Sequence, residues 1–348
     1  MKFRAILALL LALVLSLSLV ACGGQGTATD SATVSGTDSS VEQNTDGQNN
    51  TALPETVRVA ALSGSTGLGM AKLMTDAAGG TTKNTYSFEV YDAPELLLPE
   101  ITAKKYDIAA LPTNVAAKLY NKTNGELQIL AVNTLGVLYM LEIGTETVKS
   151  VADLRGKTVY TTGQGSTPEY ALRYILEQNG LVPGTDVEIV YEATADAVVS
   201  HAGEGVLMML PEPKVTAVKS SVEKATVVLD MTAEWNKVCS TPMAQGCVVV
   251  TKEFAEKYPA AVANFLEEYE ASINFVKNNV SEASEMVATH GIIPKAPLAA
   301  KAIPNSNLTF SAGADMKNIL VPFYQVLFNA DKTSIGGAMP ADNFYYGA

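Results

Sequence analysis

The sequence has few of the residues on which metal and nucleic-acid sites depend. It contains two histidines, His201 and His290, and three cysteines, and no pair of them has metal-ligand spacing. Lysine and arginine number 24 against 36 aspartates and glutamates, for a formal net charge of −12. Nucleic-acid binding needs clustered cations that displace counterions from phosphates. We therefore expect no metal and no nucleic-acid partner.

The chain has a single apolar run that approaches membrane-spanning length, and this run lies at the N-terminus. Lys2 and Arg4 precede it, and only Ser16 and Ser18 interrupt the apolar residues that continue to Ala21. A basic start followed by a short apolar segment predicts a secretory signal peptide over residues 1–21. The remainder of the chain is then exported.

The end of this segment, Leu19-Val20-Ala21-Cys22, resembles the bacterial lipoprotein signal. The resemblance implies that Cys22 becomes the lipidated first residue, palmitate included, and holds the protein on the extracytoplasmic face of the cell membrane. A simple signal peptide with a chance cysteine is the alternative. Residues 23–54 contain no lysine, arginine or aromatic residue, so a disordered linker is expected over 22–54.

From residue 55 the pattern alternates between short apolar runs and helical stretches. With 348 residues the chain exceeds one ordinary core, so two lobes are expected. The predicted strands fall in two groups of five: Val57 to Leu62, Tyr86 to Tyr91, Asp107 to Leu111, Leu127 to Val132 and Gly136 to Glu142, then Thr158 to Thr161, Glu188 to Tyr191, Val206 to Leu210, Thr226 to Asp230 and Cys247 to Thr251. Helices are expected at Leu68 to Ala78, Asn114 to Asn121 and Pro168 to Asn179, and after Thr251. This order predicts an α/β fold with mixed, mostly parallel sheets.

Polar loops follow four of the predicted strands. They are Ser63-Gly64-Ser65-Thr66-Gly67, Pro112-Thr113-Asn114, Thr162-Gly163-Gln164-Gly165-Ser166-Thr167-Pro168 and Pro211-Glu212-Pro213. In open α/β sheets ligands bind outside the carboxyl ends of strands, where these loops should lie. The first loop has neither the ending of a Walker A motif nor the glycine order of a dinucleotide site, so no cofactor is expected.

No sequence motif for catalysis is present. There is no Gly-x-Ser-x-Gly elbow and no His-Glu-x-x-His motif, and neither histidine has a nearby triad partner. We therefore expect a protein that is not an enzyme. Cys239 and Cys247 form a candidate disulfide, since an exported protein permits one, but Cys247 fits equally well as a small core residue.

The segment Val148-Lys149-Ser150-Val151-Ala152-Asp153-Leu154-Arg155-Gly156-Lys157-Thr158-Val159 is similar to one in ABC-transporter substrate-binding proteins with the type II periplasmic-binding fold. The resemblance is strongest to the branch that binds nitrate, taurine, alkanesulfonates and thiamine precursors. It continues through Gly163 to Tyr170, Leu210 to Pro213, Gly246 to Pro259 and Ile335 to Tyr346. It covers essentially everything after residue 55.

The resemblance implies two lobes, residues 55–135 plus 243–348 and residues 136–242, joined by two crossover strands. It implies a monomer that captures a small polar solute between the lobes and delivers it to an ABC permease and its ATPase. The residues expected to bind ligand are Ser63, Gly64, Ser65, Thr66, Thr113, Asn114, Gly163, Gln164, Ser166, Thr167 and Glu212. A sulfonate, a carboxylate, an amine and a pyrimidine all stay open, because no arginine is placed to clamp an anion. A lipid-anchored sensor of the same fold and a pyrimidine-precursor synthase-like enzyme are the alternatives.

Overall fold

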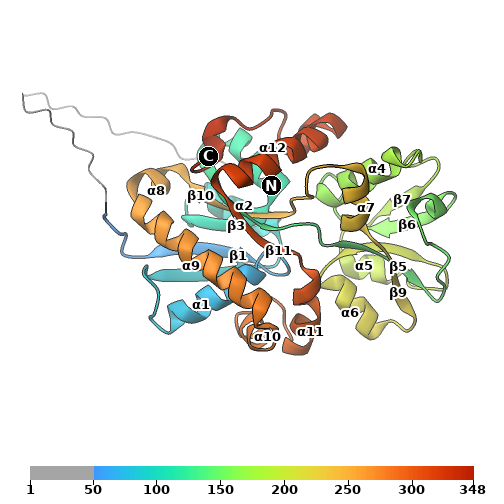
Figure 1. Cartoon of the computed structure of the whole chain (residues 1–348), viewed down its shortest axis with the longest axis horizontal. Coiled ribbons are helices and arrows are strands. Elements are labelled where there is room, and N and C mark those ends of the chain that lie inside the picture. The colour runs from blue at the N-terminus through green and yellow to red at the C-terminus, as the bar shows by residue number, and fades with distance from the viewer. Residues whose placement is uncertain (1–50) are drawn as a thin grey trace, which may run out of the picture. The chain divides into compact units, whose positions relative to one another are not determined.

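The computed structural model describes residues 51–348, so the expected signal peptide, Cys22 and most of the expected linker lie outside the described residues. Two β-sheets flanked by helices organise the described chain (Figure 1). The six-stranded sheet has the order β11 (Leu308–Ala312), β4 (Leu127–Thr134), β10 (Gly246–Thr251), β3 (Ile108–Pro112), β1 (Val57–Leu62) and β2 (Tyr86–Tyr91). The five-stranded sheet has the order β7 (Glu188–Tyr191), β6 (Thr158–Thr161), β8 (Leu207–Pro211), β5 (Leu138–Ile143) and β9 (Ala225–Asp230).

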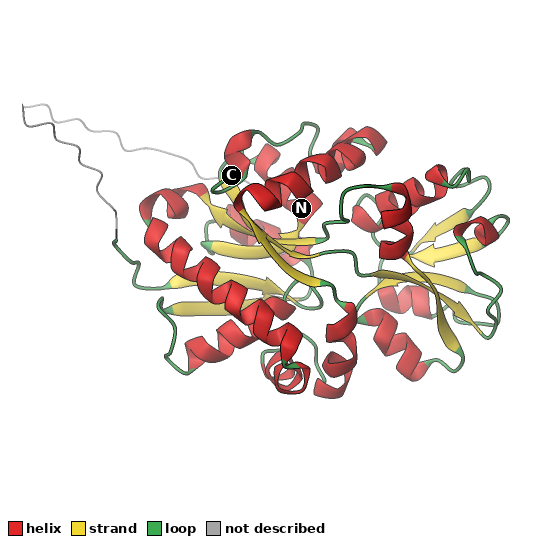
Figure 2. Ribbon diagram, viewed as in Figure 1, coloured by secondary structure: helices red, strands yellow, loops and turns green. Residues whose placement is uncertain are grey.

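Helices flank both sheets (Figure 2). Those beside the six-stranded sheet are α1 (Ala71–Ala78), α2 (Pro94–Thr102), α3 (Thr113–Lys122), α8 (Lys252–Lys257), α9 (Pro259–Asn278), α10 (Val280–Thr289), α11 (Ala296–Ala302) and α12 (Gly313–Ala330). Those beside the five-stranded sheet are α4 (Thr167–Gln178), α5 (Ala195–Val199), α6 (Lys214–Ser221) and α7 (Met231–Val238). Short 3-10 helices occur at Leu68–Met70, Val151–Leu154, Ile303–Asn305, Lys332–Ile335 and Asp342–Phe344. None of the helices among residues 51–348 is long and apolar enough to cross a membrane.

The predicted α/β fold is confirmed, with two corrections. Parallel pairing is limited to β1 with β2 and β3, and β6 with β7 and β8, so the sheets are mixed rather than mostly parallel. The pairs made by β10 and β5 are antiparallel because each of these strands enters its sheet directly after the chain has crossed from the other sheet, and β11 is antiparallel to β4. The second correction is β11, a strand that we did not predict within the helical C-terminal part.

Both faces of the six-stranded sheet are buried. Val57, Val59 and Ala61 of β1 belong to one hydrophobic cluster, while Ala60 and Leu62 belong to another. The second cluster continues into the five-stranded sheet, where the Trp235 ring of α7 lies 5.8 Å from the Phe323 ring of α12. A strand that is buried on both faces leaves few positions for polar side chains in its middle. The loops at the strand ends therefore offer the most room for functional polar groups.

Candidate functional site

A cavity of about 660 Å³ is enclosed by residues from both sheets, and we call it the inter-sheet cavity. It is lined by Leu62, Ser63, Gly64, Ser65, Thr66, Asp92, Pro94, Glu95, Pro112, Asn114, Val115, Thr134, Val137, Leu138, Ser166, Thr167, Pro168, Pro211, Glu212, Pro213, Lys214, Gln245, Gly291, Ile292 and Pro294. Because β1, β2 and β3 are parallel, their carboxyl ends meet at one edge, and those of β6 and β8 meet likewise. This is the position where open α/β sheets bind ligands, and the volume is typical of small-molecule sites.

Eight of the eleven predicted site residues line this cavity. They are Ser63, Gly64, Ser65, Thr66, Asn114, Ser166, Thr167 and Glu212. They come from loops up to about 150 positions apart in the chain, as in the 3.0 Å hydrogen bond from Ser65 Oγ to the Glu212 carbonyl oxygen. The structure thus brings the predicted loops together at one cavity. Contact of these residues with a ligand stays a prediction.

The loop after β1 makes close contacts with the opposite side of the cavity. Gly64 has φ +83°, a conformation that L side chains rarely adopt, and an added Cβ would lie 3.5 Å from Pro213 Cδ. The Gly64 amide donates to the carbonyl oxygen of Ile292 at 2.9 Å, which draws the loop after α10 to the cavity wall. Ser65 Oγ also lies 3.1 Å from Ser306 Oγ. These contacts hold the loop after β1 against Pro213 on one side and against Ile292 and Ser306 on the other.

The N-termini of α3 and α4 meet at the cavity. Thr167, the first residue of α4, donates its Oγ1 hydrogen to Asn114 Oδ1 of α3 at 3.2 Å. The Asn114 side chain is fully buried, and its Nδ2 has no hydrogen-bond partner. Lys118, one turn further along α3, donates to the carbonyl oxygen of Gly165 at 2.9 Å. Two independent hydrogen bonds therefore connect α3 with the loop before α4 and its first turn.

Glu212 is a buried carboxylate at the end of β8. Its oxygens accept hydrogen bonds from Thr216 N at 3.2 Å and Thr216 Oγ1 at 2.9 Å, which caps the first turn of α6. Burial raises the pKa of the Glu212 carboxyl group, against smaller lowering effects from the Thr216 hydrogen bonds and the charge of Lys219. Glu212 is thus both the cap of α6 and the most buried acid of the cavity wall.

Three predicted site residues lie outside the cavity wall. Thr113 is fully buried, and its Oγ1 donates to the carbonyl oxygen of Ala244 at 2.6 Å, so it ties α3 to the chain that crosses between the sheets. Gly163 has φ +83°, where a Cβ would lie 2.8 Å from Ser166 Oγ, so it permits the tight turn before α4. Gln164 is exposed at that turn. All three residues lie in predicted loops whose other residues line the cavity.

Sequence reasoning missed several wall residues. Asp92, Pro94 and Glu95 follow β2, and a polar loop leading into a helix with proline in its first turn is a signal that could have found them. Gln245 lies in the chain that crosses between the sheets, and Gly291 to Pro294 follow a helix rather than a strand. No local pattern identifies these two segments, because tertiary packing alone brings them to the cavity.

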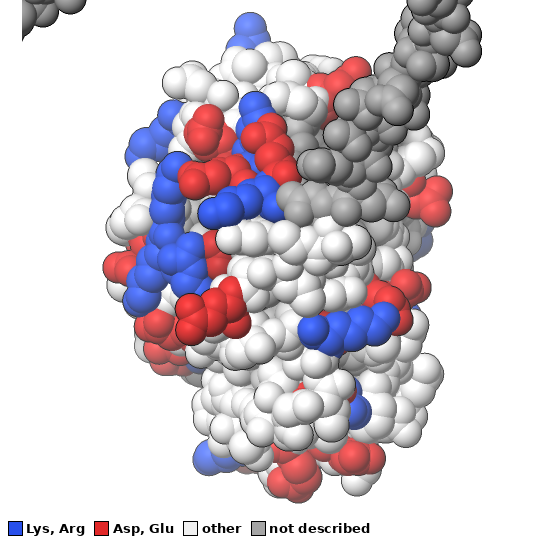
Figure 3. Space-filling view, turned by 90° about the vertical axis from the view of Figure 1, so that its left-hand side faces the viewer, with Lys and Arg blue, Asp and Glu red and all other residues white. Residues whose placement is uncertain are grey.

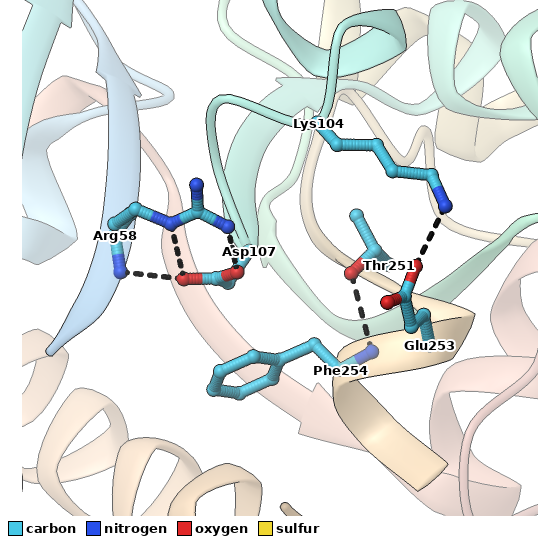
Figure 4. Close-up of polar contacts among 6 residues, drawn as sticks. All are labelled: Arg58, Lys104, Asp107, Thr251, Glu253 and Phe254. Carbon is cyan, nitrogen blue, oxygen red and sulfur yellow. Dashed lines mark hydrogen bonds and ion pairs between the residues drawn. The ribbon is translucent and has the colours of Figure 1, made fainter. Parts of the chain in front are cut away.

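A smaller cavity of about 290 Å³ lies near the start of β1, and charged side chains in its wall form ion pairs with one another (Figure 4). Arg58 Nε and the Arg58 amide each donate to Asp107 Oδ2 at 2.9 Å, and Lys104 Nζ lies 2.6 Å from Glu253 Oε2. At this side of the molecule acidic and basic residues alternate without a patch of one sign (Figure 3). We therefore interpret this cavity as a structural feature and not as a ligand-binding site.

The histidines and cysteines of the described chain are not among the residues that line the inter-sheet cavity. The His201 ring stacks on Tyr160 and its Nε2 lies 2.7 Å from Glu192 Oε1, while His290 Nε2 lies 2.9 Å from Thr75 Oγ1. Residues 51–348 hold no group of three or more histidine, cysteine or acidic side chains that could bind a metal ion.

The candidate disulfide is not formed, because both cysteines are free. Cys247 is buried inside β10, where its Sγ lies 3.4 Å from the carbonyl oxygen of Leu111 in β3. Cys239 ends α7, a helix that packs on the five-stranded sheet. Both side chains contribute to the same hydrophobic cluster, and Cys247 takes the alternative role of a small core residue.

Solved structures of binding proteins share this fold. An ABC transporter protein from Parabacteroides distasonis is 20% identical with a TM-score of 0.70, over 84% of this chain and 99% of that one. The periplasmic aliphatic sulphonate binding protein SsuA from Escherichia coli is 19% identical with a TM-score of 0.66, over 80% and 88%. The alkanesulfonate-binding protein SsuA from Xanthomonas axonopodis pv. citri, bound to MOPS, is 13% identical with a TM-score of 0.62, over 83% and 96%. The chain thus has the fold of periplasmic binding proteins.

Sequence comparison assigns the family. No curated protein matches the chain at a significant level. A family model described as "Menaquinone biosynthesis" matches residues 69–314, a span that includes the strands of the five-stranded sheet, all the helices at the cavity and most of the cavity wall. This span is well over half of the 348 residues, and the chain therefore belongs to the menaquinone biosynthesis family.

Proposed function

We propose that this protein is an extracytoplasmic binding protein that captures a small polar solute in the inter-sheet cavity. The observation that carries the proposal is the cavity itself, about 660 Å³ enclosed by loops from the strand ends of both sheets. Its wall combines apolar residues such as Val115, Leu138 and Ile292 with a few polar side chains. That combination is typical of small-molecule sites, in which the polar groups select and orient the ligand.

Capture rests on closure of two lobes over the solute. We assign residues 55–135 and 243–348 to one lobe and residues 136–242 to the other, because the strands of each sheet fall within one of these sets. The hydrogen bonds from Ser65 to Glu212 and from Thr167 to Asn114 join the lobes across the cavity. We propose that these bonds belong to the closed arrangement and that a solute bridging the same loops stabilises it.

The closed protein is then the form that a membrane partner distinguishes from the open one. Binding proteins of ABC transporters among the solved structures support an ABC permease and its ATPase as that partner. We propose a monomer held on the extracytoplasmic face of the cell membrane by lipidated Cys22, a residue outside the described part of the chain.

A thermal-shift screen of the full chain against sulfonates, amino acids, pyrimidines and vitamins tests this function. A solute at 100 times its dissociation constant adds about 2.7 kcal/mol to the free energy of unfolding, and several degrees of melting temperature follow. Cavity-filling Ser166→Trp should abolish the shift, whereas Ser220→Trp on the far end of α6 should retain it. A shift that persists in Ser166→Trp would contradict binding in the inter-sheet cavity.

Family membership favours a second candidate, an enzyme of menaquinone biosynthesis. Among the residues of the wall, Glu212 is the best placed general acid or base, because it is the most buried acid there and burial raises the pKa of its carboxyl group above the ordinary value. The two candidates make different predictions for the solute. Mass spectrometry of the solute after prolonged incubation with the protein should return an unchanged mass for a binding protein and a product mass for an enzyme.

A further inference from the structure

The inter-sheet cavity contains one buried donor without a partner. Asn114 is fully buried in the first turn of α3, it is one of the residues that line the cavity, and its Nδ2 lacks a hydrogen bond. Leaving a buried amide hydrogen unpaired costs the free energy of removing that donor from water. A solute that supplies an acceptor at this point recovers that free energy on binding, so the unpaired amide indicates one end of the solute.

The surroundings of Asn114 favour an acceptor that carries negative charge. Thr167 Oγ1 donates to Asn114 Oδ1, which orients the amide so that its Nδ2 is the atom left for the solute. The N-termini of α3 and α4 both lie at this point of the wall. Helix N-termini carry partial positive charge and stabilise carboxylates and similar anions.

The charged residues of the wall favour a positive group at the other end of the solute. The wall has three acids, Asp92, Glu95 and Glu212, and no arginine. Its one lysine, Lys214, points its charge at Asp196, with Nζ 3.3 Å from Oδ1. A plain anion such as an alkanesulfonate would face three acids against a single lysine, and that lysine already pairs with Asp196.

On the basis of the proposed solute-binding function, we propose that the cavity takes a zwitterionic solute, whose carboxylate or sulfonate accepts a hydrogen bond from Asn114 while its protonated amine faces the acidic wall. The solute therefore has a single anionic end, bound by amide and helix N-termini instead of arginine, and a single cationic end. This class differs from that of a plain sulfonate, which lacks the amine.

Matched probes test the two ends separately. We would titrate the full chain calorimetrically with zwitterions from alanine to phenylalanine and 2-aminoethanesulfonate, with their deaminated anions, and with the corresponding amines that lack the acid. Hydrogen bonds to charged groups contribute about 1.5–3 kcal/mol, so the best zwitterion should bind at least about ten-fold tighter than either of its truncated partners.

Two substitutions then locate the ends in the cavity. Asn114→Asp keeps the side-chain volume but replaces the donor with a negative charge, so affinity for the best zwitterion should fall at least about ten-fold; Asn114→Ala should also weaken it. Glu95→Gln should weaken binding about two- to five-fold. Glu100→Gln on the same helix, outside the cavity wall, should leave affinity unchanged.

The outcomes separate this inference from the proposed function. A deaminated anion that binds as tightly as its zwitterion overturns the ligand class and leaves solute capture intact. Wild-type or tighter affinity in Asn114→Asp overturns the assignment of Asn114 as the donor. Absence of binding by every zwitterion overturns the inference, and the proposed function fails as well only if the whole thermal-shift screen is also negative.

Discussion

Thr167 Oγ1 donates a hydrogen bond to Asn114 Oδ1 at 3.2 Å, and this bond joins a helix of the five-stranded sheet to a helix of the six-stranded sheet. The two residues are fully or almost fully buried, and both line the inter-sheet cavity. In the proposed closed state this bond joins the two lobes, and it also orients the Asn114 amide.

Removing this bond should weaken capture. Thr167→Val keeps the shape of the side chain but deletes the donor, at a cost of about 1 kcal/mol to the closed state. Affinity for the best solute of the screen should fall about five-fold in isothermal titration calorimetry. Thr123→Val is the matched control, because the Thr123 hydroxyl bonds only within the end of α3. Equal affinities for wild type and Thr167→Val would argue against a role for this bond in closure.

Both Thr113 and Ser166 were predicted to bind ligand, but replacing Thr113 should lower stability whereas replacing Ser166 should lower ligand affinity. Thr113→Ala removes a buried bond to the Ala244 carbonyl oxygen and should lower the free energy of unfolding by about 1–3 kcal/mol. Ser166→Ala removes a part-buried hydroxyl of the cavity wall and should reduce affinity with little change in stability. Urea unfolding and calorimetry on both variants measure these effects. Unchanged stability with reduced affinity in Thr113→Ala would instead indicate that Thr113 contacts the ligand.

Glu212 should make stability fall with rising pH. Burial raises its folded pKa above the unfolded value of about 4.3, so its contribution is fully present below that value and is lost as the pH rises through the folded pKa. Glu212→Gln cannot ionise and should therefore gain stability relative to wild type between pH 4 and 8. Melting curves across this range measure the difference, with exposed Glu285→Gln as the control. A difference that does not change with pH would contradict the buried carboxyl group.

Glu142 should show the reverse dependence. Burial raises the pKa of this carboxyl group, but hydrogen bonds from Thr147, Thr145 and the Val148 amide outweigh burial and lower it below its ordinary value. The stabilisation is present above the unfolded pKa of about 4.3 and is lost as the pH falls through the folded pKa.

The variant Glu142→Gln isolates this effect. It should lower the free energy of unfolding by about 1–3 kcal/mol at pH 7, because the neutral amide cannot accept all of these bonds, and by less at pH 3. Glu146→Gln, an exposed residue of the same turn that pairs with Lys149, serves as the control. Urea titrations at the two pH values give the comparison, and a deficit that grows on acidification would be the contrary result.

Cys22 should determine where the protein is retained. If the cysteine carries the lipid, Cys22→Ala should release the chain from washed membranes, since two or more acyl chains are what makes anchoring stable. Fractionation followed by immunoblotting measures the released share, with Cys239→Ala as the matched control. Retention of the Cys22→Ala variant on the membrane would contradict anchoring through a lipid on Cys22.

The sequence predicts most strands well because their residues are locally apolar and β-branched, as in Val57–Leu62 and Gly246–Thr251. It misses β11, whose segment Leu308–Ala312 is short, has mixed composition and is a strand only through long-range pairing with β4. Strand direction also escapes local reasoning, because β10 is antiparallel to β3 and β4 as a consequence of the path between the sheets.

The site is predictable to the extent that it follows strand ends. Asn114, Thr167 and Glu212 follow predicted strands and line the cavity. Thr113 belongs to the same loop as Asn114, yet its hydroxyl turns to the Ala244 carbonyl oxygen, and only the three-dimensional path of the chain shows this. The Gly291 to Pro294 segment reaches the wall through the Gly64–Ile292 backbone bond, a contact between residues distant in sequence.

The most direct measurement is a crystal structure of the full chain grown with the solute that gives the largest thermal shift. If the inter-sheet cavity is the binding site, density for that solute lies within this cavity, in contact with Asn114 and with residues of both sheets. Density confined to the Arg58–Asp107 cavity or to the protein surface, with the inter-sheet cavity filled only by water, would contradict it.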